Sequence, residues 1–235
     1  MLRSRQAFED QLAQLQQRLL QMGSFVEAML EKAVRALTEQ DLNLAHEVIS
    51  ADDIADEMDL DIEKHCMRLL ALQQPMAGDL RLIGTVMKVI ADVERIGDYS
   101  VDIARVAIKL ADTEYFKPLV DIPRMAEMVR RMLRLALEAL VQKDLEVVAE
   151  IIDFDDEVDK TWYALLDELE GIMEKRSDVV RQAVCFLLIA RYLERIADHT
   201  VNIAERVAYM VTGRFESLAP SHRSDYEPPG PASSE

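Results

Sequence analysis

The chain has 235 residues, half of them hydrophobic and 6% aromatic, with only seven glycines and seven prolines, a composition typical of long helices around an apolar core. Its formal net charge of −17 disfavours nonspecific binding to nucleic acid or to an anionic membrane surface, so cations and basic protein surfaces are the favoured partners. The two cysteines, Cys66 and Cys185, lack metal-ligand spacing, and we interpret them as buried thiols in a reducing cytoplasm.

The first half of the chain predicts three amphipathic helices. Apolar residues recur at spacings of three and four from Phe8 to Leu37, the stripe of a helix of about thirty residues. Gly23 interrupts this stripe at a cost of about 1 kcal/mol relative to Ala, which suggests a close helix crossing. Asp41 is the expected cap of a second helix that ends before Pro75. A third helix is expected to follow and to end near residue 110.

Residues 113–123 break the helical pattern with two prolines and are the expected linker. The second half then repeats the first, so we expect an all-α protein of two tandem three-helix bundles, an internal duplication with long antiparallel helices. The predicted domains are residues 1–112 and 124–213, and residues 214–235 are the expected disordered tail. The amino terminus has no apolar segment typical of a secretory signal, and the apolar run at 183–190 is far shorter than the ~20 residues that span a bilayer.

The duplication preserves a pair of acids. Residues 92–104 recur one hundred residues later, at 192–204, and in both copies a Glu precedes an Asp by four residues: Glu94 with Asp98, and Glu194 with Asp198. Four residues are just over one helical turn, so each pair shares a face. The simplest alternative is a solvated acidic face with Arg95 and Arg195 as counterions. Repetition of the pair in the same register favours a cation site instead.

A second pair of acids repeats on the preceding helix of each half, at an offset of 103 residues. On helical wheels the acids of the first half lie at the margin of the core face, about 40–120° from its centre. Acids on the margins of two antiparallel neighbours can converge over the groove between them. The sequence therefore predicts one metal site in each half: Asp52, Asp56, Glu94 and Asp98 in the first, and Asp155, Asp159, Glu194 and Asp198 in the second.

Oxygen ligands alone suit hard cations and are a poor match to structural zinc. The candidate divalent or trivalent ions are Mg, Mn, Fe and Zn. The second site is the weaker prediction, because Asn202 stands where the first half has Asp102 and Ala197 where it has Gly97. A carboxylate-bridged di-metal enzyme in a helical bundle is an alternative, but its usual Glu-x-x-His pairs are absent from the sequence. A metal-storage protein is a further alternative.

Four stretches together resemble the PhoU family, the accessory regulators of phosphate-specific transport in bacteria. They are Met-Gly-Ser-Phe-Val-Glu at 22–27, Gln-Gln-Pro-Met-Ala-Gly-Asp-Leu-Arg at 73–81, Asp-Val-Glu-Arg-Ile-Gly-Asp at 92–98 and Leu-Glu-Arg-Ile-Ala-Asp at 193–198. The resemblance covers residues 5 to about 215. It agrees in spacing, internal repeat and number of helices.

The resemblance implies an all-α protein of two bundles that forms a homodimer and holds metal clusters on the bundle surface through ExxxD and DxxxD motifs. Members of the family are cytoplasmic negative regulators of phosphate uptake and of the phosphate-starvation genes. They connect the ATPase subunit of the phosphate ABC transporter to a membrane sensor histidine kinase. The resemblance implies no catalysis, and with the composition it gives no expectation of nucleic-acid binding or direct membrane insertion.

Overall fold

The computed structural model describes residues 2–72, 75–214 and 217–218. Within this part the chain forms six α-helices and one short 3₁₀ helix and contains no strand: α1 (Leu2–Glu39), α2 (Leu42–Leu72), α3 (Ala77–Leu110), α4 (Asp121–Gln142), α5 (Glu146–Lys175), η1 (Ser177–Val179) and α6 (Val180–Thr212). The expected tail at 214–235 lies outside the described residues except for Arg214, Ser217 and Leu218.

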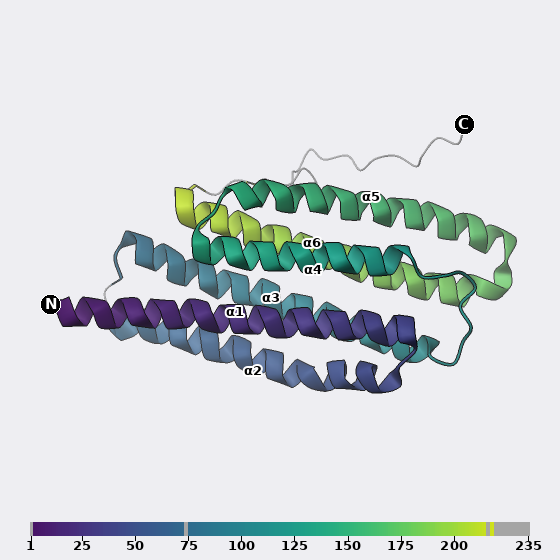
Figure 1. The fold of residues 1–235 in the computed structure, drawn as a ribbon, viewed down its shortest axis with the longest axis horizontal. Coiled ribbons are helices and arrows are strands. Elements are labelled where there is room, and N and C mark those ends of the chain that lie inside the picture. Colours follow the sequence, from purple (N-terminus) through teal and green to yellow (C-terminus); the bar gives the residue numbers. More distant parts are fainter. Residues whose placement is uncertain (1, 73–74, 215–216, 219–235) are drawn as a thin grey trace.

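The helices form two bundles that lie side by side. Helices α1, α2 and α3 pack against one another, as do α4, α5 and α6, and the bundles meet where α3 contacts α6 and α1 contacts α4. In Figure 1 the long helices run nearly parallel to the long axis of the molecule, with α2 and α5 on opposite outer sides. The predicted all-α fold of tandem three-helix bundles is thereby confirmed.

Equivalent turns begin the second helix of each bundle. Gln40 and Lys143 adopt positive φ values of 54° and 57° and end the preceding helices. Asp41 then accepts hydrogen bonds from the N–H groups of Asn43 (2.8 Å) and Leu44 (3.3 Å), as expected of an aspartate at a helix start. Asp144 accepts one from the N–H of Glu146 at 2.8 Å. The duplication therefore preserves turn chemistry as well as apolar spacing.

Helix α4 begins at Asp121, so the last three residues of the expected linker are helical. Asp121 and Ile122 are helical, and Pro123 occupies the first turn, where a residue without an N–H group leaves no intrahelical hydrogen bond unmade. The remaining linker is attached to both bundles. The Tyr115 hydroxyl donates to the carbonyl oxygen of Leu37 at 2.7 Å, and the Phe116 N–H donates to Oε1 of Gln182 at 2.8 Å.

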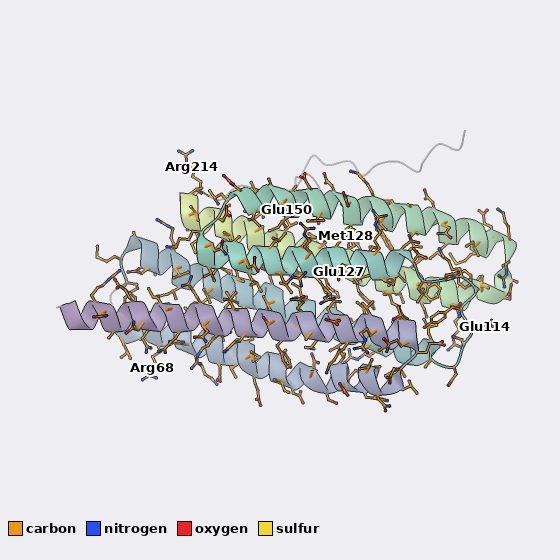
Figure 2. All side chains as sticks on the ribbon, in the orientation of Figure 1. Arg68, Glu114, Glu127, Met128, Glu150 and Arg214 are labelled. Carbon is orange, nitrogen blue, oxygen red and sulfur yellow. The ribbon has the colours of Figure 1, made fainter. Side chains whose placement is uncertain are left out.

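The contact between α1 and α4 depends on Gly23. A Cβ atom at this position would lie 2.0 Å from Cδ1 of Leu137, so a side chain here would collide with α4. The close crossing that the sequence suggested at this glycine is thus present, between the two bundles. Beside it, Arg130 of α4 pairs with Glu27 (3.2 Å) and Glu31 (2.7 Å) of α1. Figure 2 labels Glu127 of α4, which also pairs with Arg130 at 3.2 Å.

The described helices contain no segment that is both long and apolar enough to cross a membrane.

Candidate functional site: two carboxylate clusters

The first cluster lies between α2 and α3 and comprises Asp52, Asp56, Asp59, Glu94 and Asp98. Burial raises the pKa of Asp52, and repulsion from Asp56 and Asp98 raises it further. Burial also raises the pKa of Glu94, with additional repulsion from Asp98, Asp56 and Asp59. These mutual effects place carboxylates of α2 and α3 within electrostatic reach of one another. The four acids predicted for the first half thus lie near one another on α2 and α3, without converging on one point.

Asp59 belongs to this cluster although the sequence analysis did not select it. Burial raises its pKa, and Glu63 and Asp56 repel its charged form. Its Oδ1 atom is buried and has no hydrogen-bond partner. The spacing of 52, 56 and 59 along the chain was a usable signal, because residues four and seven apart lie on one face of a helix.

The second cluster lies between α5 and α6, where Asp159 and Asp198 act on Glu194, and the fourth predicted ligand, Asp155, lies one turn before Asp159 on α5. Its acids lie deeper, since Asp155 is only 1% exposed and Glu194 only 8%. Burial raises the pKa of Glu194 to about 7, with further contributions from Asp198 and Asp159 that Arg191 opposes. A carboxyl with such a pKa binds its proton near neutral pH unless a cation takes the place of the proton.

The two clusters differ in how their charge is compensated. Arg191 Nη1 lies 2.5 Å from Glu194 Oε1, and its guanidinium carbon lies 5.9 Å from the centre of the Trp162 ring. At the equivalent positions of the first half, the sequence has Ala91 in place of the arginine and Asp59 in place of the tryptophan. The second cluster is therefore bordered by an exposed arginine, Arg191, and the first contains an additional acid.

Local arginines pair with the exposed ends of both clusters, as the alternative reading of a solvated acidic face expected. Arg95 lies 2.8 Å from Asp98 and 3.5 Å from Glu94, and Arg195 lies 3.2 Å from Asp198. All of these side chains are at least partly exposed, so each pair contributes little to stability. These arginines pair with carboxylates that the sequence analysis assigned to metal sites.

Asn202, which made the second cluster the weaker prediction, does not lie in that cluster. Its Nδ2 atom lies 3.3 Å from Oδ1 of Asp92, and Nδ1 of His199 lies 2.9 Å from the same oxygen. Both contacts join α6 to α3 across the interface between the bundles. The difference between Asp102 and Asn202 therefore does not alter the candidate metal ligands of the second half.

The donor atoms fit a hard cation, although they are not gathered at one point. Within residues 2–72, 75–214 and 217–218, no group of three or more Asp, Glu, His or Cys side chains is placed so that it could hold a metal ion. Each cluster nevertheless has a buried carboxylate oxygen without a hydrogen-bond partner, Asp59 Oδ1 in the first and Glu194 Oε2 in the second. An unpartnered buried oxygen is costly, and a cation drawn in by neighbouring carboxylates would satisfy it.

Both halves of the chain are similar to one family domain. The family model of the PhoU domain matches residues 19–107 and again residues 122–207. The chain is 38% identical, over 92% of its length and 99% of the relative, to a phosphate-specific transport system accessory protein PhoU homolog of Clostridium acetobutylicum. It is 37% identical to the homolog of Aquifex aeolicus, over 87% of this chain and 93% of that one.

Two solved structures have the same fold. The crystal structure of PhoU from Pseudomonas aeruginosa superposes with a TM-score of 0.84 at 36% identity, covering 88% of this chain and all of that one. The phosphate transport system regulatory protein PhoU from Streptococcus pneumoniae also gives 0.84, at 31% identity, and covers 90% of this chain. Similarity over nearly the whole length, in both sequence and structure, determines the family of this chain.

Proposed function

The chain belongs to the PhoU family, and from that premise we propose that it is a negative regulator of phosphate uptake and of the phosphate-starvation genes. The observation that supports this proposal most directly is the match of both halves to one family domain, together with the full-length relatives named as accessory proteins of phosphate-specific transport. Those relatives are named as accessory proteins and not as enzymes, and we propose a non-catalytic role for this chain as well.

The proposed mechanism is that of an adaptor in the cytoplasm. One surface would contact the ATPase subunit of the phosphate ABC transporter, and another would contact a sensor histidine kinase, with the protein acting as a homodimer. Two bundles packed side by side give long, separate helical faces for two partners. The charge of −17 favours partner surfaces that are basic, because complementary charge accelerates association and selects partners.

We further propose that the two carboxylate clusters bind metal ions. The supporting features are the repeated spacing, the convergence of acids from neighbouring helices and the buried unpartnered oxygens Asp59 Oδ1 and Glu194 Oε2. Binding would draw the partly exposed carboxylates inward by side-chain rotation, since their helices need not move for χ angles to change. A bound cation would neutralise repulsion within each cluster and so stabilise the groove that a partner meets.

The regulatory role is tested by alkaline phosphatase activity in high-phosphate medium, a readout of the starvation genes. The parent strain, a deletion of this gene and the deletion complemented with the intact chain are compared. We expect high activity in the deletion alone. Equal, low activity in all three strains would contradict negative regulation by this chain in that organism.

The metal proposal is tested by Mn²⁺ binding in equilibrium dialysis. The double variant Glu94→Ala/Asp98→Ala should bind less Mn²⁺ than the unaltered chain, while its helical circular dichroism is unchanged. The matched control is Glu170→Ala/Glu174→Ala, which removes two exposed acids of α5 at the same spacing outside both clusters. Equal binding by the Glu94/Asp98 variant and the control would remove the site assignment.

A further inference from the structure

A pocket of about 640 Å³ lies at the end of the molecule where the two bundles meet. Its walls come from the last residues of α3, the linker, η1 and the first residues of α6. Figure 1 places the linker and the start of α6 together at this end, and Figure 2 labels Glu114 of the linker there. Pockets of roughly 300–1,000 Å³ are the usual size for small organic ligands.

The pocket is lined by one more cationic than anionic side chain, although the chain as a whole is strongly acidic. Lys109, Arg176 and Arg181 line it, against the two acids Glu114 and Asp178. Arg176 pairs with Asp178 at 2.7 Å. Neither Lys109 nor Arg181 has a carboxylate partner in the described part of the chain. In a chain with a net charge of −17, two such cations at one pocket indicate an anionic ligand.

The start of α6 adds further positive potential at the same place. Helix α6 begins at Val180 directly after η1, and no side chain caps its N-terminus. Because the turn of η1 precedes the first N–H groups of α6, the favourable contribution to a bound anion is that of the helix dipole. Val179 and Arg181, on either side of this start, both line the pocket.

The wall opposite is held in place before any ligand arrives. The Gln182 side chain accepts from the N–H of Phe116 at 2.8 Å and donates to the carbonyl oxygen of Glu114 at 3.0 Å. The rings of Tyr115 and Phe116 lie 5.4 and 5.5 Å from the ring of Phe186. A preformed wall reduces the ordering cost of binding, and its apolar surface can contact an organic group.

We propose that this pocket binds a small phosphorylated anion, with a phosphate group between Lys109 and Arg181 at the start of α6. Any organic portion of the ligand would lie against the linker wall of Tyr115 and Phe116. A bound ligand would contact α3 of one bundle and α6 of the other, and so link the two bundles. This inference goes beyond the proposed regulatory function and does not depend on it.

Cys185 provides a readout inside the pocket. It lines the pocket and is partly exposed, whereas Cys66 is fully buried and burial raises its pKa to about 12. A thiol reagent should therefore modify Cys185 first, since the thiolate is the reactive form. We would measure the rate of Cys185 modification by N-ethylmaleimide, assigned by mass spectrometry, in excess EDTA so that no metal bridges phosphate to the carboxylate clusters.

The ligands compared are inorganic phosphate, pyrophosphate, AMP, ATP and adenosine, each at millimolar concentration. We expect at least one phosphorylated compound to slow the modification of Cys185 and adenosine not to do so. Protection by phosphate or pyrophosphate as strong as that by the nucleotides would identify a free inorganic anion as the ligand. Protection by the nucleotides alone would identify an organic phosphate. Protection by none, or equal protection by adenosine and AMP, would overturn the proposal.

Charge reversal tests the assigned cations. Lys109→Glu and Arg181→Glu should each raise the concentration needed for half-protection about tenfold, the equivalent of about 1.4 kcal/mol. Lys88→Glu is the matched control, because it makes the same change on the exposed surface of the same helix, about 30 Å from Lys109. The comparison is made with and without anion within each variant, so that altered thiol reactivity cancels. An equal loss in Lys88→Glu would mean diffuse electrostatic attraction and would overturn the site.

Discussion

In the first half Glu94 faces Asp56 and Asp59 of the neighbouring helix, whereas in the second half Glu194 pairs with Arg191 beside Trp162. Both halves inherited the same spacing of acids from one duplication. The first cluster has an additional carboxylate and a more exposed groove, while the second has greater burial and a cation of its own. Spacing alone therefore does not determine the net charge of a cluster, because in the second half Arg191, one turn away on the same helix, offsets the charge of Glu194.

The largest difference expected between the halves concerns the pH dependence of stability without metal. Burial raises the pKa of Glu194 from 4.5 to about 7. The ionised carboxylate therefore destabilises the folded state, and this effect is absent below about pH 4.5, grows as pH rises and is complete above about pH 7. Glu194→Gln removes the charge, and we expect it to increase the free energy of unfolding by about 3 kcal/mol at pH 8, since the pKa of about 7 already includes the opposing effect of Arg191. Urea denaturation in EDTA measures this.

The matched variant in the other half is Glu94→Gln, which should stabilise the protein less at pH 8 because Glu94 is more exposed than Glu194. Both variants should be nearly neutral at acidic pH, where the carboxyls are protonated in the folded and unfolded chain. A gain from Glu194→Gln that is as large at pH 5 as at pH 8 would show that packing, and not ionisation, is responsible.

A smaller effect on metal binding is expected when the arginine at position 191 is removed, or when an arginine is placed at the equivalent position of the first half. Ala91→Arg places an arginine at the exposed position of α3 that corresponds to Arg191, and it should weaken binding of Mn²⁺ to the first cluster about tenfold. Arg191→Ala should have the opposite effect on the second cluster. Isothermal titration with Mn²⁺ measures both affinities. No change in either variant would mean that these arginines do not compete with the metal.

The smallest effect concerns the glycine that distinguishes the two motifs. A Cβ at Gly97 would lie 3.6 Å from Cγ2 of Val26 and 3.9 Å from the Cβ of Ala55, which are ordinary van der Waals contacts. Gly97→Ala should therefore increase the free energy of unfolding by about 0.5–1 kcal/mol through helix propensity alone. Ala197→Gly in the second half should decrease it by a similar amount. Destabilisation by Gly97→Ala would indicate that the α1 to α3 spacing is tighter than these distances.

Local sequence information was sufficient to predict the helices and the position of the acids. Apolar periodicity and the repeat determined the two bundles, and the aspartate at 41 correctly located the start of a helix. The four acids expected in each half do lie on facing helices. Asp59 could have been found by the same reasoning, because its spacing from Asp52 is that of two helical turns.

The partners across the grooves could not be predicted in this way. Arg191 lies over Trp162 because of the way α5 packs on α6. Similarly, Asn202 contacts Asp92 because of the way α6 packs on α3. These contacts join residues far apart in the sequence. Periodicity indicates which face of a helix is buried, but not which residue of another helix meets it.

The contact of Gly23 with Leu137 has a consequence for how the two bundles can move. If α4 slid by one helical turn along α1, about 5.4 Å, Leu137 would leave the only glycine of α1 and meet a residue with a side chain, such as Leu19 or Glu27. Sliding by one turn in either direction would therefore bring Leu137 against a side chain. The packing of Leu137 against Gly23 therefore determines the register of one bundle on the other.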